Sequence, residues 1–331
     1  MRRLPFTVLL VACCALSLSA GCGDDEPGTP SPPGQDGGPP DAGGAPDAGS
    51  PDGGDGGAPD AGPGDAGGPW VLSSVPAEGS TDLYPVEVYY RTTGQKGLAE
   101  RKVLTVTFNV PMDTSITQTM LYDKTDPHAE PRPVEGTWSV DAKTLTLTVL
   151  QPEEGGPVLY GENAYAVDLR GFQDAEGHSL DAAHAGLGDG RLDFQTAPND
   201  ELLNHACGHT LADATAAVSA SATPTGTLPR TDVTHKYYEV TVPSDGGAPS
   251  GHTRLRLLPE ASYLLFLDVQ VSVSLSQLAS GTPVDSALEQ TPPACAGITS
   301  RVRFTTPGDD ADLRAHFMGA SKFHAILEQS F

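Results

Sequence analysis

The chain has 331 residues and a formal net charge of −24 at pH 7, with 19 Lys and Arg against 43 Asp and Glu. Affinity for nucleic acid depends on cationic side chains that neutralise phosphates, so this balance excludes DNA or RNA binding as the main activity. The length is enough for about two ordinary domains once a leader and a linker are subtracted.

Residues 1–21 have the pattern of an export signal. Arg2 and Arg3 give a positive start, and an apolar run follows from residue 6 to residue 18. A bilayer-spanning helix needs about 20 apolar residues, so this run is too short to span and indicates a secretory signal peptide. Small residues then lead to Cys22.

The segment Ser19-Ala20-Gly21-Cys22 resembles the lipobox of bacterial lipoproteins, although Leu18 stands one position further back than is usual. The resemblance implies that Cys22 carries diacylglycerol and fatty acyl chains such as palmitate, and becomes the first residue of the mature protein. We therefore expect a lipid-anchored protein of the cell envelope, at the outer membrane, on its periplasmic face or at the cell surface. The alternative is an ordinary signal peptide cut nearby, with Cys22 unmodified.

Residues 22–69 are almost wholly Gly, Pro, Asp, Ala and Ser, and Pro-Asp-Ala-Gly recurs at Pro40, Pro46 and Pro59. Such a segment cannot bury enough apolar surface to offset the entropy of ordering. The composition predicts a disordered linker with an r.m.s. reach of about 35–40 Å or more. Its expected role is to hold the folded part away from the membrane.

Residues 70–197 contain short strand patterns separated by turn residues. In the segment 104–108, Leu104, Val106 and Phe108 alternate with Thr, and the segments 145–149 and 165–169 alternate in the same way. Alternation places the apolar residues on one face of a sheet. The pattern predicts an antiparallel β-sandwich.

The order of several motifs in this region resembles SbsA-type bacterial Ig-like domains. The motifs are Val75-Pro76-Ala77-Glu78-Gly79-Ser80, Thr107-Phe108-Asn109-Val110-Pro111-Met112-Asp113, Asp174-Ala175-Glu176-Gly177-His178 and Phe194-Gln195-Thr196. The resemblance implies an Ig-like fold that acts as a structural or adhesive module. The Phe-x-x-Pro strand is also similar to that of copper-binding CopC proteins, but no His precedes His128 to match their N-terminal ligand. We expect Asp113 and Asp174 to serve turns and not catalysis.

Residues 198–331 contain a second set of short strands and resemble no family specifically. The segments 237–242, 253–258, 263–269, 271–275, 301–304, 313–317 and 323–327 have strand character. Six or seven short strands with Gly and Pro between them predict a second β-sandwich or a jelly roll. The expected fold class is therefore all-β, with two sandwich domains after a disordered linker.

Two cysteines, Cys207 and Cys295, remain if Cys13 and Cys14 are lost with the cleaved leader and Cys22 is lipidated. An even pair in an exported protein predicts a disulfide bond.

A metal site is the alternative for the same region. On a strand, the side chains of His205, Cys207 and His209 would share one face, and with His235 or Cys295 they could bind copper or zinc. The two hypotheses compete because a sulfur in a disulfide is not a thiolate ligand.

Recognisable catalytic signatures are missing from the sequence, including the Gly-x-Ser-x-Gly elbow, His-Glu-x-x-His, phosphate loops and dinucleotide fingerprints. We therefore expect a protein that is not an enzyme and has no cofactor. The predicted function is that of a structural or binding module, with an envelope protein or polysaccharide as partner. The alternative function is that of a copper- or zinc-binding envelope lipoprotein.

Overall fold

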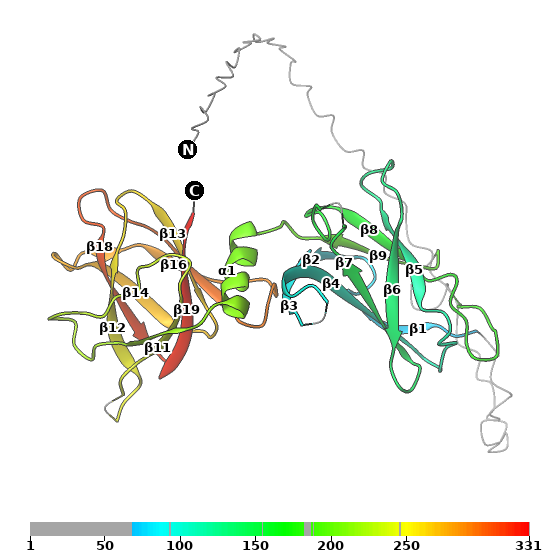
Figure 1. Cartoon of the computed structure of the whole chain (residues 1–331), viewed down its shortest axis with the longest axis horizontal. Helices are drawn as coiled ribbons and strands as arrows, with labels where there is room; N and C mark the ends of the chain where they lie inside the picture. Colours follow the sequence, from blue (N-terminus) through cyan, green and yellow to red (C-terminus); the bar gives the residue numbers. More distant parts are fainter. Residues whose placement is uncertain are drawn as a thin grey trace, which may run out of the picture. The chain divides into compact units, whose positions relative to one another are not determined.

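A computed structural model describes residues 68–330 except residues 93, 154, 182–186, 188 and 245. In these residues it contains 19 strands and one α-helix, which confirms the predicted all-β class (Figure 1). None of the described residues form a helix that is long and apolar enough to cross a membrane. The predicted signal peptide, Cys22 and the predicted linker up to residue 67 lie outside the described residues.

The first sandwich is one nine-stranded sheet that closes around a single apolar core. The strand order is β1-β4-β7-β6-β5-β8-β9-β2, with β3 paired to β4. The strands are β1 (Val71–Val75), β2 (Ser80–Leu83), β3 (Glu87–Arg91), β4 (Gly97–Phe108), β5 (Gln118–Asp123), β6 (Arg132–Trp138), β7 (Thr144–Leu150), β8 (Ala164–Asp168) and β9 (Arg191–Thr196).

The alternating strands bury the residues that the sequence pattern placed on the core face. Leu104, Val106 and Phe108 of β4 are at most 1% exposed, and Leu145 and Leu147 of β7 are fully buried. The Thr residues between them lie on the opposite face of the sheet. The predicted packing of these strands is confirmed.

Asp113 and Asp174 serve turns, as expected. The Asp113 carboxylate accepts a hydrogen bond from the backbone N–H of Ser115 at 2.9 Å. The Asp174 carboxylate accepts from the backbone N–H groups of Glu176 at 3.0 Å and His178 at 2.8 Å. Although burial acts to raise the pKa of Asp174, the hydrogen bonds from the ring and backbone of His178 lower it below its ordinary value.

The second sandwich consists of two sheets that enclose a second apolar core. The six-stranded sheet has the order β10-β11-β19-β13-β17-β16, and the four-stranded sheet has the order β12-β18-β14-β15. The strands are β10 (Ala216–Ser219), β11 (Tyr237–Thr241), β12 (Ser250–Arg256), β13 (Ser262–Leu267), β14 (Ser272–Gln277), β15 (Pro283–Val284), β16 (Ser286–Gln290), β17 (Ser300–Thr305), β18 (Asp312–Met318) and β19 (Lys322–Ser330).

The segment that carries His205, Cys207 and His209 is not a strand but the helix α1 (Glu201–Ala212). The Asp200 side chain caps the helix by accepting from the Leu203 backbone N–H at 3.0 Å. At the other end, the Asp213 backbone N–H donates to the His209 carbonyl at 3.2 Å. The strand expectation is wrong because these local caps, together with packing against a sheet, stabilise a helix whose apolar pattern is weak.

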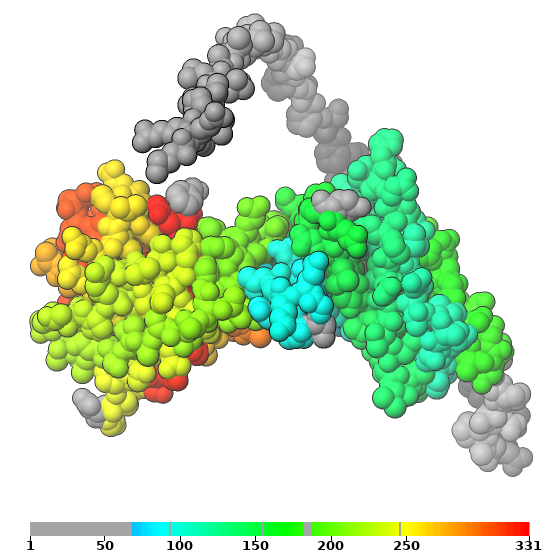
Figure 2. Space-filling model, in the orientation of Figure 1, coloured from blue at the N-terminus to red at the C-terminus, as the bar shows by residue number. Residues whose placement is uncertain are grey.

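Helix α1 covers the outer face of the six-stranded sheet. Leu203 and Ala206 of the helix are fully buried and share an apolar cluster with Leu264, Phe266 and Ile326 of the sheet. This explains why the middle of β13 is apolar without alternation, since both of its faces are buried. In the space-filling view, the light-green helix segment lies directly against the yellow-green residues of this sandwich (Figure 2).

Candidate metal centre

Helix α1 presents different chemistry on its two sides. His205 and His209 are four residues apart and therefore lie on one face, whereas Cys207 points to the opposite side. Cys207 is fully buried and forms a disulfide with Cys295, at a Cα–Cα distance of 5.9 Å. The predicted disulfide is confirmed. The prediction of Cys207 as a metal ligand is wrong, because its sulfur is bonded to Cys295 and faces away from the two histidines.

The third histidine comes from the loop before β11. His235 has a φ of 60°, a left-handed conformation that is uncommon for a residue other than glycine. Its backbone N–H donates to the Leu327 carbonyl of β19 at 3.0 Å. Such a conformation costs free energy and persists where the surroundings hold it in place. Here it brings the imidazole over β19.

A buried carboxylate that the sequence analysis did not identify completes the group. Phe323, Ala325 and Leu327 of β19 face the sandwich core, so by alternation Ile326 and Glu328 face the α1 side. Glu328 is fully buried. A buried charge is costly unless it is paired, so an acidic residue directly after an apolar strand run was the available signal.

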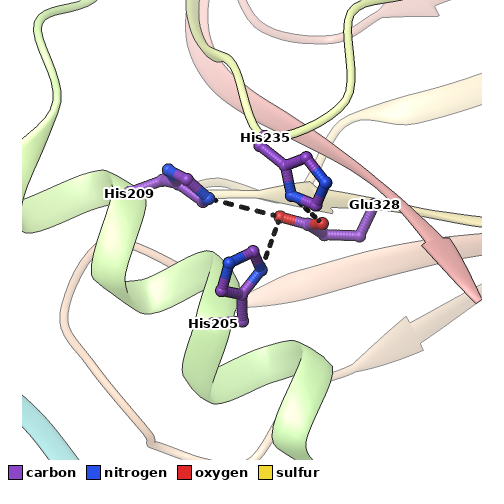
Figure 3. Close-up of side chains that lie close together, drawn as sticks. All are labelled: His205, His209, His235 and Glu328. Atoms are coloured by element: carbon purple, nitrogen blue, oxygen red, sulfur yellow. Dashed lines mark ion pairs between the residues drawn. The ribbon is translucent and has the colours of Figure 1, made fainter. Parts of the chain in front are cut away.

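The three imidazoles converge on this carboxylate (Figure 3). His235 Nδ1 lies 2.8 Å from Glu328 Oε2, His205 Nδ1 lies 3.4 Å from Oε1, and His209 Nε2 lies 3.8 Å from Oε1. One ligand atom from each of the four residues lies within 4.8 Å of the others. Donor atoms around a tetrahedral ion with bonds of 2.0–2.1 Å are about 3.3 Å apart, so the spacing suits a metal ion after small movements.

The buried polar atoms at the centre lack hydrogen bonds. Both oxygens of Glu328 and Nε2 of His209 are buried without a hydrogen-bond partner, and their contacts with one another are ion pairs. Unsatisfied buried polar groups are rare and call for an explanation. A cation held between the carboxylate and the imidazoles would satisfy all three atoms.

One histidine is oriented from behind by a second carboxylate. Nδ1 of His209 lies 2.6 Å from Asp213 Oδ2, at the C-terminal end of α1. This contact leaves Nε2 directed toward Glu328. Metal-binding histidines commonly donate their other ring N–H to a carboxylate, which fixes the ring and raises its basicity.

We expect Asp213→Asn to weaken metal binding about tenfold, toward the lower end of the usual effect of such outer partners. Asn retains a hydrogen-bond acceptor for His209 but removes the negative charge. A negative charge is unfavourable at a helix C-terminus, so the substitution should leave the melting temperature unchanged or slightly higher. Titration of both proteins with Zn²⁺ measures the effect. Equal affinities would show that Asp213 has no part in the site.

The group is open to solvent on one side. The side chains of His205 and His235 are 52% and 55% exposed, while that of His209 is 19% exposed and that of Glu328 is 0% exposed. A bound ion would therefore rest on a buried anion and remain accessible through the two outer imidazoles. This arrangement permits exchange of the ion with the medium and leaves room for a water ligand.

Two other groups of titratable residues do not form comparable sites. Asp174, Glu176 and His178 also lie close together, but the Asp174 carboxylate is occupied by the turn hydrogen bonds and by the His178 ring at 2.9 Å. His252 of β12 and His316 of β18 are directly opposite each other with ring centroids 4.3 Å apart. The His316 ring nitrogen is already paired with the Ser250 hydroxyl at 2.9 Å.

The His252–His316 pair predicts a loss of stability in acid. Burial lowers the pKa of both imidazoles below the ordinary 6.5, and nearby positive charge, including Arg314, acts in the same direction. The unfolded chain therefore takes up protons at higher pH than the folded one, so the free energy of unfolding falls as the pH drops below about 6.5. The double variant His252→Gln/His316→Gln should show a smaller fall between pH 7.5 and 5.5 in urea titrations. An identical pH dependence in both proteins would contradict this.

No family model matches the chain, and no curated protein matches it. Among solved structures, it is similar to CopC from Methylosinus trichosporium OB3b, with 13% sequence identity and a TM-score of 0.25. The alignment covers 40% of this chain and 96% of that chain. A likeness at this level carries no argument about the metal. The lipobox and the SbsA-type resemblance remain predictions.

Proposed function

We propose that this protein binds a divalent transition-metal ion through His205, His209, His235 and Glu328. The observation that carries the proposal is the fully buried Glu328 carboxylate, whose two oxygens lack hydrogen bonds beneath three converging imidazoles. Without a metal ion, only the contacts with the imidazoles offset the cost of burying this carboxylate. A metal ion supplies the compensating charge.

Zinc and copper(II) suit this donor set best. Imidazole nitrogen binds both ions well, and a carboxylate oxygen completes a mixed nitrogen and oxygen set. The sulfurs of Cys207 and Cys295 are joined in a disulfide, so no thiolate of this pair is available to favour copper(I). Three neutral imidazoles and one carboxylate leave a net charge of about +1 with a divalent ion, and the exposed side of the site can hydrate it.

The proposed setting is the cell envelope. We propose that Cys22 carries the lipid anchor and that residues 22–69 form the tether. An intact mass of the mature protein equal to that of the unmodified chain would contradict the anchor. The protein would then bind metal at a distance from the membrane, without catalysis.

A second candidate function is a structural or adhesive module that contacts an envelope protein or polysaccharide. It is favoured by the sequence resemblance of residues 70–197 to Ig-like modules. The two functions differ in their requirement for the ion. A purely structural module would keep its stability after chelation and would retain no metal.

The test of the metal proposal is titration of the full chain after chelator treatment, with Zn²⁺ and Cu²⁺ in separate experiments. We expect one ion per chain and a higher melting temperature in the presence of the ion, since a ligand at 100 times its Kd stabilises the folded state by about 2.7 kcal/mol. His128→Gln is the matched control, because His128 is exposed and lies outside the cluster. Retention of full binding by His205→Ala/His209→Ala would overturn the proposal.

A further inference from the structure

Helix α1 carries two ligands of the metal cluster on one face and one end of a disulfide on the other. We propose that the Cys207–Cys295 disulfide controls the metal affinity of the cluster, so that the oxidised protein binds the ion and the reduced protein binds it more weakly. This inference rests on the proposed function and adds its regulation.

The cluster is assembled from two halves. Glu328 lies on β19, which pairs with β11 on one side and β13 on the other, and His235 is tied to β19 through the Leu327 carbonyl. This half belongs to the sheet. The other half consists of His205 and His209, whose position relative to the sheet depends on how α1 is attached.

The attachment of α1 differs along its length. Near its N-terminus, Asp200 is paired with Arg301 of β17, and Leu203 and Ala206 are buried against the sheet. From Cys207 onward the helix contains no further fully buried apolar side chain. The disulfide is therefore the covalent tether of the half-helix that carries His209, beside the packing of Gly208 against Leu98 and of Thr210 against Gly297.

The partner segment of the disulfide is itself held in place. The Ala294 carbonyl accepts from the Val88 backbone N–H at 2.9 Å, and Ala294 is fully buried. Gly297 lies so close to Thr210 that a Cβ at this glycine would approach the Thr210 side chain to 2.8 Å. The bridge thus connects the second half of α1 to an anchored segment and not to a loose loop.

His209 is the ligand most sensitive to this tether. Its Nε2 is already the farthest of the three ring atoms from the Glu328 carboxylate, at 3.8 Å against 3.4 Å and 2.8 Å. Loosening the helix end would lengthen this contact first. A three-ligand remainder of His205, His235 and Glu328 would bind the ion less tightly.

The chemical step is a simple reduction. An external dithiol or phosphine supplies two electrons, the S–S bond breaks, and the two sulfurs take up two protons to give Cys207 and Cys295 thiols while the reductant is oxidised. The Cys207 thiol would still point away from the cluster, because it is two residues from both His205 and His209 on the helix. It cannot replace a lost ligand unless the helix turns.

Thermodynamic linkage makes the effect reciprocal. If reduction lowers the affinity for the ion by a given factor, bound ion must make the bridge harder to reduce by the same factor. The ion and the disulfide would then stabilise each other in an oxidising compartment. Reduction of the disulfide would weaken binding and favour release of the ion.

The experiment compares three forms of the full chain in anaerobic Zn²⁺ titrations. These are the oxidised protein, the protein reduced with a resin-bound phosphine that is removed before titration, and Cys207→Ser/Cys295→Ser. We expect the reduced protein and the double variant to bind about tenfold more weakly than the oxidised protein, within the usual range of coupling between sites. Circular dichroism establishes that each form is folded under the titration conditions, and the reduced wild-type protein replaces the variant if the variant is unfolded.

Three results overturn the inference. Equal affinities of the oxidised and reduced proteins would show that the disulfide does not control the cluster, while leaving the metal site itself intact. Tighter binding by the reduced protein, absent in the double variant, would show that thiolates act as ligands. Absence of Zn²⁺ binding by the oxidised protein would instead remove the proposed function, and the inference with it.

Discussion

Glu328→Gln should weaken metal binding about 100-fold or more while leaving the metal-free protein as stable as the wild type or more stable. Both effects have the same origin. Glu328 is the only carboxylate among the four ligands of the described cluster, and it is fully buried with neither oxygen hydrogen-bonded. Gln has nearly the same shape but carries no charge, so it removes the anionic ligand and the cost of burying it.

The sign of the stability change separates two accounts of the cluster. If the carboxylate is compensated by protonated imidazoles and not by a metal ion, removal of its charge loses that pairing and should destabilise the metal-free protein. Urea unfolding in the presence of a chelator measures the stability of the metal-free protein, and calorimetric titration measures its affinity for Zn²⁺. Glu135→Gln is the control, because Glu135 lies exposed on β6. A destabilised metal-free Glu328→Gln protein that binds Zn²⁺ normally would refute the metal account.

Cys207→Ala/Cys295→Ala should reduce the stability of the second sandwich by about 4–5 kcal/mol. The bridge joins residues 88 positions apart. In the chain-entropy model, closing a loop of this length lowers the entropy of the unfolded chain and raises its free energy by about 4–5 kcal/mol. Both Cys side chains are replaced together, so no unpaired thiol is left in the buried cluster. The unfolding midpoint in guanidinium chloride, followed by far-UV circular dichroism, measures the loss.

The positions of the tryptophans provide an internal control. The chain has two Trp residues, Trp70 and Trp138, and both lie in the region of the first sandwich. Tryptophan fluorescence therefore reports mainly on the first sandwich, which the bridge does not cross-link internally. We expect the fluorescence transition to shift much less than the dichroism transition. Equal shifts would mean that the two sandwiches unfold as one cooperative unit, and an unchanged dichroism midpoint would contradict the stabilising role of the bridge.

The strands were predictable because their burial follows local sequence period. Within residues 104–108 of β4 and 145–149 of β7, apolar side chains alternate with threonines, and the structure buries the apolar set. In β13 the apolar run is continuous, which indicates a strand buried on both faces but does not identify what covers it. The covering element is α1, and it was missed.

The helix was missed because its signals are weak and local to its ends. Asp200 is a good N-cap and Glu201 favours the first turn, but the residues between Leu202 and Ala212 contain no strong apolar period. Alternation of His205, Cys207 and His209 looked like one face of a strand. In a helix the same spacing separates the cysteine from the histidines, which removes Cys207 from the metal site and joins it to Cys295.

The sequence by itself determined the strands with their buried faces and the cysteine pair, and it predicts an export leader and a disordered linker over residues 22–69. The strands follow from interactions between neighbours in the chain, and the disulfide prediction follows from the even number of cysteines left if the leader is cleaved and Cys22 is lipidated. Only the tertiary structure decided the proposed metal centre. Glu328 lies 119 to 123 positions from the two helical histidines and 93 from His235, and nothing in a linear sequence specifies that α1 docks over β19. That docking is driven by burial of apolar surface, and the hydrophobic effect is non-directional, so sequence patterns do not indicate which elements will pack together. The four residues of the proposed site therefore come together only in the folded chain.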